Sequence, residues 1–237
     1  MGFGQTFNQS IVGVLRPVSL HNLFFGDSVN RPISAVEWPV SLQEVWFEDH
    51  FNQHILGVVW PDSLQNLGHQ FSKTIVGVGW PASLQKPSFG DRFNKPIARV
   101  SWSPFLQQLL FGCYFNQTIT GIKLPDSLQQ LSFGDRINQP IAGIGWPASL
   151  PQLCFGCFFN QPITGVVWPA LLRQLSFGDQ FNQAIIGVVL PDSLQQLSFG
   201  LNFTNRSRES CGLGPCSNCR LGTAFTSPSS KYCGRLV

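Results

Sequence analysis

The chain has 237 residues, of which 43% are hydrophobic, 13% are aromatic and only 11% are charged. Because charged residues usually form about a quarter of a soluble protein, the surface is expected to be neutral and rich in amide side chains. The formal net charge of +3 is small and scattered along the chain, which argues against nucleic-acid binding, because that function requires a clustered basic face.

The start of the chain predicts neither secretion nor a membrane anchor. Residues 1–5 lack the basic start and apolar run of a secretory signal peptide. No apolar stretch approaches the length of about 18 residues that a membrane span requires. We therefore expect a soluble protein without a membrane partner, located in the cytoplasm, with the nucleus as the alternative.

The dominant feature of the sequence is a 22-residue unit that recurs from the first residues to about Phe203. Residues 132–153, SFGDRINQPIAGIGWPASLPQL, are a well-preserved copy. A fixed period of this length indicates one supersecondary unit stacked many times. One column of the unit holds asparagine in most copies, namely Asn8, Asn30, Asn52, Asn94, Asn116, Asn138, Asn160 and Asn182.

Each unit is predicted to contain one short strand and extended turns, with little helix. In residues 128–133, LQQLSF, alternate side chains point to opposite faces, so that Leu131 and Phe133 face the core. A Gly-Asp pair then permits a turn, and a proline in nearly every unit, such as Pro147, forbids a regular helix. A second short strand is predicted over residues 141–146.

Two units depart from the pattern in ways that predict local irregularity. Between Asn52 and Ser72 two residues are missing, because Leu67 runs directly into Gly68 without the usual Ser-Phe pair. We expect the strand to be shortened there. Arg99 replaces a glycine that recurs in most other units, and strain or a changed path is expected at that turn.

The repeated Phe-Asn-Gln-Pro-Ile, with Pro-x-Ser-Leu-x-x-Leu-x-Phe-Gly around it, resembles the FNIP repeat, a relative of the leucine-rich repeat. The resemblance covers residues 3–203 and implies a solenoid that makes protein–protein contacts. Together with the period, it predicts a mainly β, leucine-rich-repeat-like solenoid of nine to ten 22-residue coils with a parallel sheet. The solenoid is expected over residues 1–204 and an irregular tail over residues 205–237.

Two columns are interpreted as structural. Buried asparagine amides can satisfy backbone groups of their own coil and of the next, so an interior ladder is expected from Asn52, Asn94, Asn116, Asn138, Asn160 and Asn182. A tryptophan column that includes Trp146 could form a ladder of ligand-binding rings. Core packing is the preferred interpretation, because Leu124 and Leu190 replace tryptophan in two units.

One column varies in chemistry although its neighbours barely change. It precedes the Phe of Phe-Asn-Gln and accepts a basic, an aromatic or an amide residue. Arginine and aromatic residues are enriched at the centres of protein interfaces. The column is therefore the candidate partner-binding surface, with an unconstrained exposed position as the alternative. The candidate residues are Arg92, Tyr114, Arg136, Phe158 and Gln180.

The tail is rich in Ser, Gly and Arg and is predicted to be disordered, because it lacks the large aliphatic residues of a core. Its four cysteines have a spacing that could hold zinc tetrahedrally, with free thiols or disulfides as alternatives. They are Cys211, Cys216, Cys219 and Cys233. Cys154 and Cys157 have the spacing of a redox motif, but both replace recurring residues of the repeat, so drift within the repeat is the preferred interpretation.

No catalytic constellation is found in the sequence. Asp49, His50 and His69 fall in neighbouring coils, where a chance surface cluster is favoured over a metal site. We expect no enzymatic activity and no cofactor, with zinc bound by the tail as the alternative. The leading hypothesis is a non-catalytic repeat scaffold that binds another protein. The alternatives are a carrier of the four-cysteine zinc or redox module, and an array without a specific partner.

Overall fold

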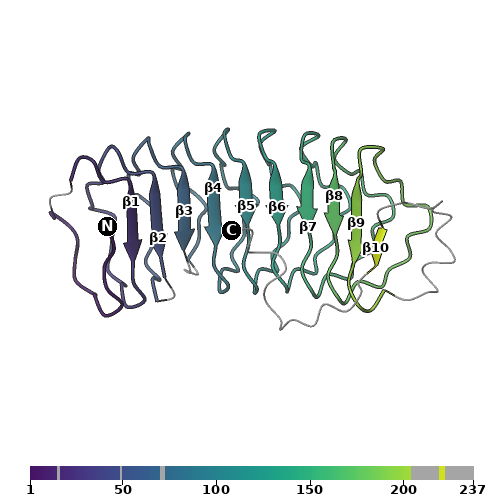
Figure 1. Ribbon diagram of the computed structural model, residues 1–237, viewed down its shortest axis with the longest axis horizontal. Helices are drawn as coiled ribbons and strands as arrows, with labels where there is room; N and C mark the ends of the chain where they lie inside the picture. The colour runs from purple at the N-terminus through teal and green to yellow at the C-terminus, as the bar shows by residue number, and fades with distance from the viewer. Residues whose placement is uncertain (15–16, 49, 70–72, 204–218, 222–237) are drawn as a thin grey trace.

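The computed structural model describes residues 1–14, 17–48, 50–69, 73–203 and 219–221 (Figure 1). Within this part of the chain every regular element is a short β-strand and no helix is present. The strands are β1 (Asn22–Phe25), β2 (Glu44–Phe47), β3 (Asn66–His69), β4 (Lys86–Phe89), β5 (Gln108–Leu110), β6 (Gln130–Ser132), β7 (Gln152–Cys154), β8 (Gln174–Ser176), β9 (Gln196–Phe199) and β10 (Cys219–Leu221).

The ten strands form one sheet in which they follow each other in chain order, and every pairing is parallel. Leu131 lies opposite Leu153, and Leu153 opposite Leu175, so each residue pairs with its equivalent 22 positions away. Each turn of the chain therefore places one strand beside the last. The predicted solenoid of 22-residue coils with a parallel sheet is confirmed.

The predicted shortening of β3 is wrong. This strand has four residues, as β2 has, and pairs with β2 along its whole length. On its other side Asn66 pairs with Lys86, only 20 residues further along the chain. The two missing residues are therefore lost after the strand. A ladder of backbone hydrogen bonds fixes the length of a strand, whereas the connection that follows tolerates deletion.

The core is a continuous apolar column that runs along the solenoid axis. Leu131, Phe133, Ile137, Ile141 and Leu150 of a single coil are all completely buried. Burying each such side chain contributes about 1.5–3 kcal/mol. These side chains are covered mainly by their equivalents in neighbouring coils, so the coils stabilise one another and no single coil would fold alone.

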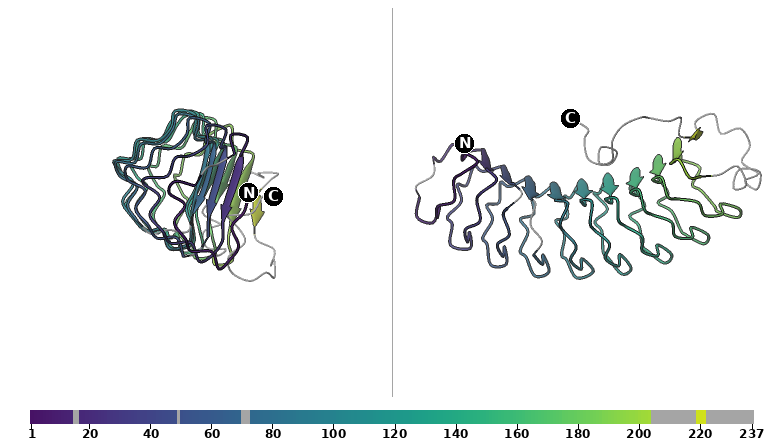
Figure 2. Two further views of the ribbon diagram at one scale, coloured as in Figure 1. Left: turned by 90° about the vertical axis from the view of Figure 1, so that its left-hand side faces the viewer. Right: turned by 90° about the horizontal axis from the view of Figure 1, so that it is seen from below.

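Stacked phenylalanine rings help to set the curvature of the molecule. The ring of Phe133 has its centroid 5.6 Å from that of Phe111 and 5.6 Å from that of Phe155, with nearly parallel planes. Paired strands lie only about 4.8 Å apart. The coils are therefore closest on the side of the sheet and diverge away from it. Figure 2 shows the resulting arc, with the strands along its concave side.

The second strand expected over residues 141–146 is absent, and a tight turn takes its place. The amide of Ile144 donates to the carbonyl of Ile141 at 3.5 Å, and Gly143 between them has φ 76°. A positive φ is accessible to glycine without steric cost. In the coil where Arg99 replaces this glycine, the amide of Val100 still donates to the carbonyl of Ile97 at 3.1 Å, so the turn is retained there.

The tryptophan column belongs to the core. The exposed fractions of Trp146 and Trp168 are only 9% and 7%. Each indole meets a phenylalanine nearly edge to face, at 6.5 Å from Phe155 and 6.3 Å from Phe177, an arrangement that aromatic pairs prefer. The indole N–H groups of the column have no hydrogen-bond partner among the described residues. These rings are packed away from solvent and present no surface for a stacking ligand.

The tail predicted to be irregular contributes one regular element. β10 (Cys219–Leu221) pairs with β9 in parallel register, with Arg220 opposite Ser198, and extends the sheet by one strand (Figure 1). The free edge of β9 offers unpaired N–H and C=O groups, which readily recruit another extended segment. The remaining residues of the tail lie outside the described part of the chain.

Candidate protein interface

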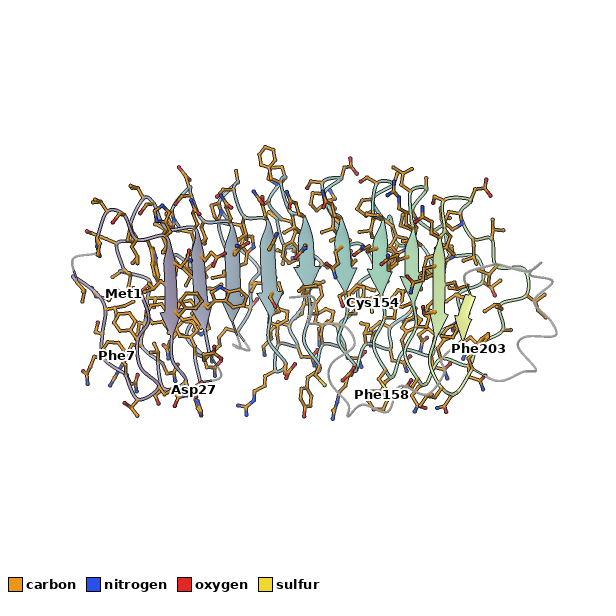
Figure 3. The ribbon with its side chains drawn as sticks, in the orientation of Figure 1. Met1, Phe7, Asp27, Cys154, Phe158 and Phe203 are labelled. Atoms are coloured by element: carbon orange, nitrogen blue, oxygen red, sulfur yellow. The ribbon has the colours of Figure 1, made fainter. Side chains whose placement is uncertain are left out.

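The variable column lies along one rim of the solenoid, in the turn that follows each strand. Figure 3 shows Phe158 at this rim, beyond the carboxyl ends of the strands. The amide of Tyr114 donates to the carbonyl of Asp91 at 2.9 Å, and the amide of Phe158 to the carbonyl of Asp135 at 2.8 Å. Such bonds from coil to coil hold the backbone of the rim in place and leave its side chains unconstrained.

The five predicted residues form an exposed row, which we call the rim stripe: Arg92, Tyr114, Arg136, Phe158 and Gln180. Tyr114 is 45% and Phe158 51% exposed. The guanidinium carbon of Arg136 lies 4.3 Å from the centre of the Tyr114 ring, a cation–π contact. The structure therefore places a base and two aromatic rings side by side in solvent.

Acids and thiols alternate in the column that precedes the rim stripe, as Asp91, Cys113, Asp135, Cys157 and Asp179. The thiol of Cys113 lies 3.4 Å from Oδ2 of Asp135, and that of Cys157 lies 3.9 Å from Oδ2 of Asp179. Burial raises the pKa of Cys113 to about 11, and its hydrogen bond to Asp135 adds to the effect. Burial also raises the pKa of Cys157. Both thiols are protonated at neutral pH and serve as donors rather than nucleophiles.

The asparagine column forms a ladder, but along the surface. Oδ1 of Asn138 accepts the backbone amide of Asn160 at 3.0 Å and Nε2 of Gln161 at 2.9 Å. The interior position expected for these residues is wrong: Asn138 is exposed and Asn160 half-buried. The preceding residue of each unit, such as the buried Ile137, occupies the interior, and alternation along an extended chain turns the asparagine outward.

The same bonding pattern extends to other coils. Equivalent bonds from the next asparagine amide are accepted by Asn8, Asn30, Asn94, Asn116 and Asn160. A glutamine of the next coil donates a second hydrogen bond to Asn30, Asn94, Asn116 and Asn160; these donors are Gln53, Gln117, Gln139 and Gln183. Asn52, Asn94, Asn116, Asn138, Asn160 and Asn182 are thus surface positions that tie coil to coil.

A serine ladder on another side of the coil was missed by reasoning from the sequence. Its hydroxyls donate to backbone carbonyls of the preceding coil at 2.7–2.9 Å. The donors are Ser41, Ser63, Ser83, Ser127 and Ser193. The signal was present as a recurring Pro-x-Ser-Leu, in which a small hydroxyl residue next to a buried leucine indicates a local backbone bond. Phe105 and Leu171 replace the serine in two coils and are exposed.

The cysteines and histidines do not form a metal site in the part of the chain that the structure describes, where no group of three His, Cys, Asp or Glu could hold an ion. Cys157 is a free thiol and Cys154 is in a disulfide, so these two are not bonded to each other. Cys211, Cys216 and Cys233 lie outside the described residues, and Cys219 is described only through the backbone of β10.

No helix among the described residues has the length and apolarity that a membrane crossing requires.

Comparison with known proteins supports the reading of the repeats. The model of the FNIP repeat family matches residues 115–158 and 159–202. The crystal structure of CroV588, described as a novel circular LRR protein structure, is 36% identical with a TM-score of 0.57, over 85% of this chain. The chain spans only 36% of the length of CroV588.

A leucine-rich repeat protein from Bacteroides ovatus ATCC 8483 aligns with 13% identity and a TM-score of 0.27, over 78% of this chain and 54% of that one. Among curated proteins, no match is found. The two successive matches to the family model fall on coils whose hydrogen-bonded columns have been described above. Residues 115–202 therefore match the FNIP repeat, and the chain has a leucine-rich-repeat-like solenoid fold.

Proposed function

We propose that this repeat scaffold is a non-catalytic protein-interaction module and that its partner binds the rim stripe. One observation carries the proposal. The rim stripe presents two large aromatic rings, Tyr114 and Phe158, which are 45% and 51% exposed, together with arginine in a single row. Tyrosine and arginine are the residues that dominate binding energy at protein interfaces.

The geometry of the rim stripe suits a partner that lies along the solenoid axis. Tyr114 and Phe158 are two coils apart, about 10 Å at the spacing of paired strands, with Arg136 between them. The coil-to-coil backbone bonds at these positions, 2.9 Å for Arg136 and 2.8 Å for Phe158, hold the side chains on a rigid base. A pre-ordered surface loses less entropy on binding.

Affinity capture with quantitative mass spectrometry tests this function. The intact chain should recover a specific partner, and Tyr114→Ala and Phe158→Ala should each reduce its recovery about tenfold, the loss typical of interface centres. Val189→Ala is the matched control, because Val189 is 82% exposed and belongs to a different column. Equal recovery by all four proteins would remove the rim stripe from consideration. A purified partner then allows dissociation constants to be compared directly.

Three further features belong to the same proposal. We infer no enzymatic activity, no nucleic-acid partner and no membrane partner. The thiols near the rim are protonated rather than activated at neutral pH, and acidic residues alternate with them along the rim. Gel retardation with duplex DNA and co-sedimentation with anionic vesicles should both be negative. Binding to the DNA would overturn the inference about nucleic acid, and binding to the vesicles would overturn the inference about membranes.

We also propose a cytoplasmic location. The free thiols Cys113 and Cys157 favour a reducing compartment, where disulfides are rare. The disulfide at Cys154 points the other way, because disulfides persist in oxidising compartments, and it therefore provides the test. In cells lysed under thiol-blocking conditions, Cys154 should be recovered in its alkylated, reduced form. Recovery of Cys154 as an oxidised residue would place the protein in an oxidising compartment instead.

A further inference from the structure

The concave face of the sheet carries a large aromatic residue and acidic residues on and next to β2. Along β2 the outward-facing residues are Glu44 and Trp46, and Glu48 follows after the strand. At the position of Trp46, four other coils hold serine, namely Ser88, Ser132, Ser176 and Ser198, whereas others hold Phe24, Gly68, Leu110 and Cys154. The position of Glu48 holds glycine in most coils, as at Gly134. A large aromatic residue, Trp46, and a carboxylate, Glu48, therefore occur together in a single coil.

Glu48 stands in a column where the scaffold leaves little space for a side chain. A Cβ built at Gly134 would lie 1.9 Å from the carbonyl oxygen of Gly112, and one at Gly156 would lie 2.1 Å from that of Gly134. Glycine in this column is thus needed for the close approach of neighbouring backbones. Glu48 carries a full side chain at the equivalent position and is exposed.

Trp46 forms a flat platform on the concave face. A Cβ built at Gly68 would lie 1.9 Å from Cε3 of Trp46. The indole therefore covers the backbone of β3 at Gly68, and a side chain at that position would displace the ring. Trp46 is 37% exposed. Phe24, in register with Trp46 on β1, is 45% exposed. Two aromatic side chains therefore lie next to each other in solvent.

A carboxylate lies beside this platform. Alternate residues of a strand are about 6.7 Å apart and share a face, so Glu44 lies next to Trp46 on the exposed face of β2, and Glu48 is the first residue after the strand. Oε1 of Glu44 accepts a hydrogen bond from Nδ2 of Asn66 at 2.6 Å, which fixes its position. Among the strand residues, the basic side chain nearest to Glu44 is Lys86, which is in register with Asn66 on the next strand. Lys86 is therefore two strands from Glu44, about 10 Å away. Salt screens charges over that distance.

We propose that Phe24, Glu44, Trp46 and Glu48, the concave aromatic patch, bind an arginine-bearing extended segment of a partner protein. A guanidinium stacks on the face of tryptophan within about 6 Å of the ring centre. On this ring it also comes within reach of the Glu44 carboxylate, on the same face of the strand. A neutral sugar would stack on the ring but would gain nothing from the charges, and an anionic ligand would be repelled.

The concave aromatic patch is independent of the rim stripe. It lies on β1 and β2, whereas the rim stripe begins with Arg92, after β4. The two surfaces can therefore be tested separately on the same protein, and failure of one leaves the other intact.

Isothermal titration calorimetry with a short peptide tests the proposal. The probe is acetyl-Gly-Arg-Ser-Arg-Gly-amide, and its control has citrulline, a neutral isostere, in place of both arginines. The arginine peptide should bind the intact chain and the citrulline peptide about tenfold more weakly or not at all. Raising the salt from about 0.05 M to about 0.5 M should weaken the binding, because the carboxylates are accessible to screening ions.

Variants locate the binding on the patch. Trp46→Ser and Glu48→Gly restore the residues found in other coils, so both are expected to fold, which thermal unfolding verifies. Each should weaken binding of the arginine peptide, Trp46→Ser by about tenfold. Phe158→Ala in the rim stripe and Asp126→Asn, an exposed acid elsewhere, are the matched controls and should bind as the intact chain does.

Three results would overturn the proposal. The first is equal binding of the arginine and citrulline peptides, and the second is unchanged affinity in Trp46→Ser. The third is binding of a neutral oligosaccharide such as cellohexaose, lost in Trp46→Ser, with no binding of the arginine peptide. That outcome would assign the platform to carbohydrate instead.

Discussion

At the scale of single residues, the side-chain oxygen of an asparagine in the repeated column links two neighbouring coils by hydrogen bonds. Oδ1 of Asn138 accepts the backbone amide of Asn160 at 3.0 Å and the side-chain amide of Gln161 at 2.9 Å. Removing it leaves a half-buried backbone N–H without its partner. Because the position lies at the surface, water can replace part of what is lost, so the cost per site is moderate.

We therefore expect Asn138→Ala to lower the free energy of unfolding by about 1–2 kcal/mol, since two hydrogen bonds are removed. Asn138→Asp is the matched control, because its carboxylate retains an acceptor at the same place, and it should lose less than half as much. Urea denaturation followed by circular dichroism measures both. Equal losses in the two variants would show that the acceptor atom is not what matters.

A thiol provides the second prediction at this scale. The pKa of Cys113 is raised to about 11, first by burial and then by its hydrogen bond to Asp135. A thiol with a raised pKa stays protonated to higher pH, and only the thiolate reacts with alkylating agents. Alkylation of Cys113 by iodoacetamide should therefore be slow at pH 8.5, below the rate of a free cysteine, and should rise until about pH 11.

Asp135→Asn removes both the charge and the carboxylate acceptor from beside Cys113, so it should lower the pKa of the thiol and speed its alkylation at pH 8.5. Cys157, which contacts Asp179 instead, serves as the internal control and should be less affected. Mass spectrometry of tryptic peptides reports both sites in one sample. A rate for Cys113 that does not change in Asp135→Asn would contradict the role of this carboxylate.

At the scale of the coil, glycine plays two separate roles. Gly143 has a positive φ and empty space around its Cβ position, whereas Gly134 is pressed against the backbone of Gly112. The first role is conformational and the second is steric. Sequence comparison among the units reveals that both positions are glycine but cannot tell the two reasons apart.

Gly134→Ala should lower the free energy of unfolding by about 1–3 kcal/mol, the usual cost of overpacking a close contact. Gly145→Ala is the matched control, because Gly145 has an ordinary φ and nothing within 4 Å of its Cβ position. That change should be neutral or stabilise the protein slightly, by restricting the unfolded chain. Chemical denaturation decides between them. If Gly134→Ala were as stable as the control, the close approach of the coils would not be limiting.

At the scale of the whole molecule, the solenoid is a one-dimensional array in which each coil contacts only its neighbours. Leu131 pairs with Leu153, and Leu153 with Leu175. Deleting residues 132–153 removes one whole unit, so the coils on either side of the deletion would pair through equivalent positions. We expect this deletion to retain the circular dichroism spectrum and cooperative unfolding, with a lower free energy of unfolding.

Deletion of half a unit, residues 132–142, is the control for this prediction. It would bring unlike columns together and place polar side chains in the core, so cooperative unfolding should be lost. Comparable spectra and unfolding transitions for the two deletions would contradict the neighbour-by-neighbour account of stability.

Much of the fold follows from the spacing of residues alone. A period of 22 with leucine and phenylalanine in fixed columns predicts coils, their stacking order and a parallel sheet. The rim stripe could also be found in the sequence, because its residues vary where their neighbours do not. The concave aromatic patch could not, since its identification depends on Trp46 covering Gly68 and on Phe24 lying beside it.

The sequence by itself determined which residues are equivalent, because identical neighbours must lie on one another and the period measures that distance along the chain. Only the tertiary structure decided the path within a coil. It turned the asparagine column outward, replaced an expected strand with the turn at Gly143, and kept β3 at full length. The physical reason is that repetition fixes the translation between coils, whereas the direction of each side chain depends on backbone angles that the repeat leaves free.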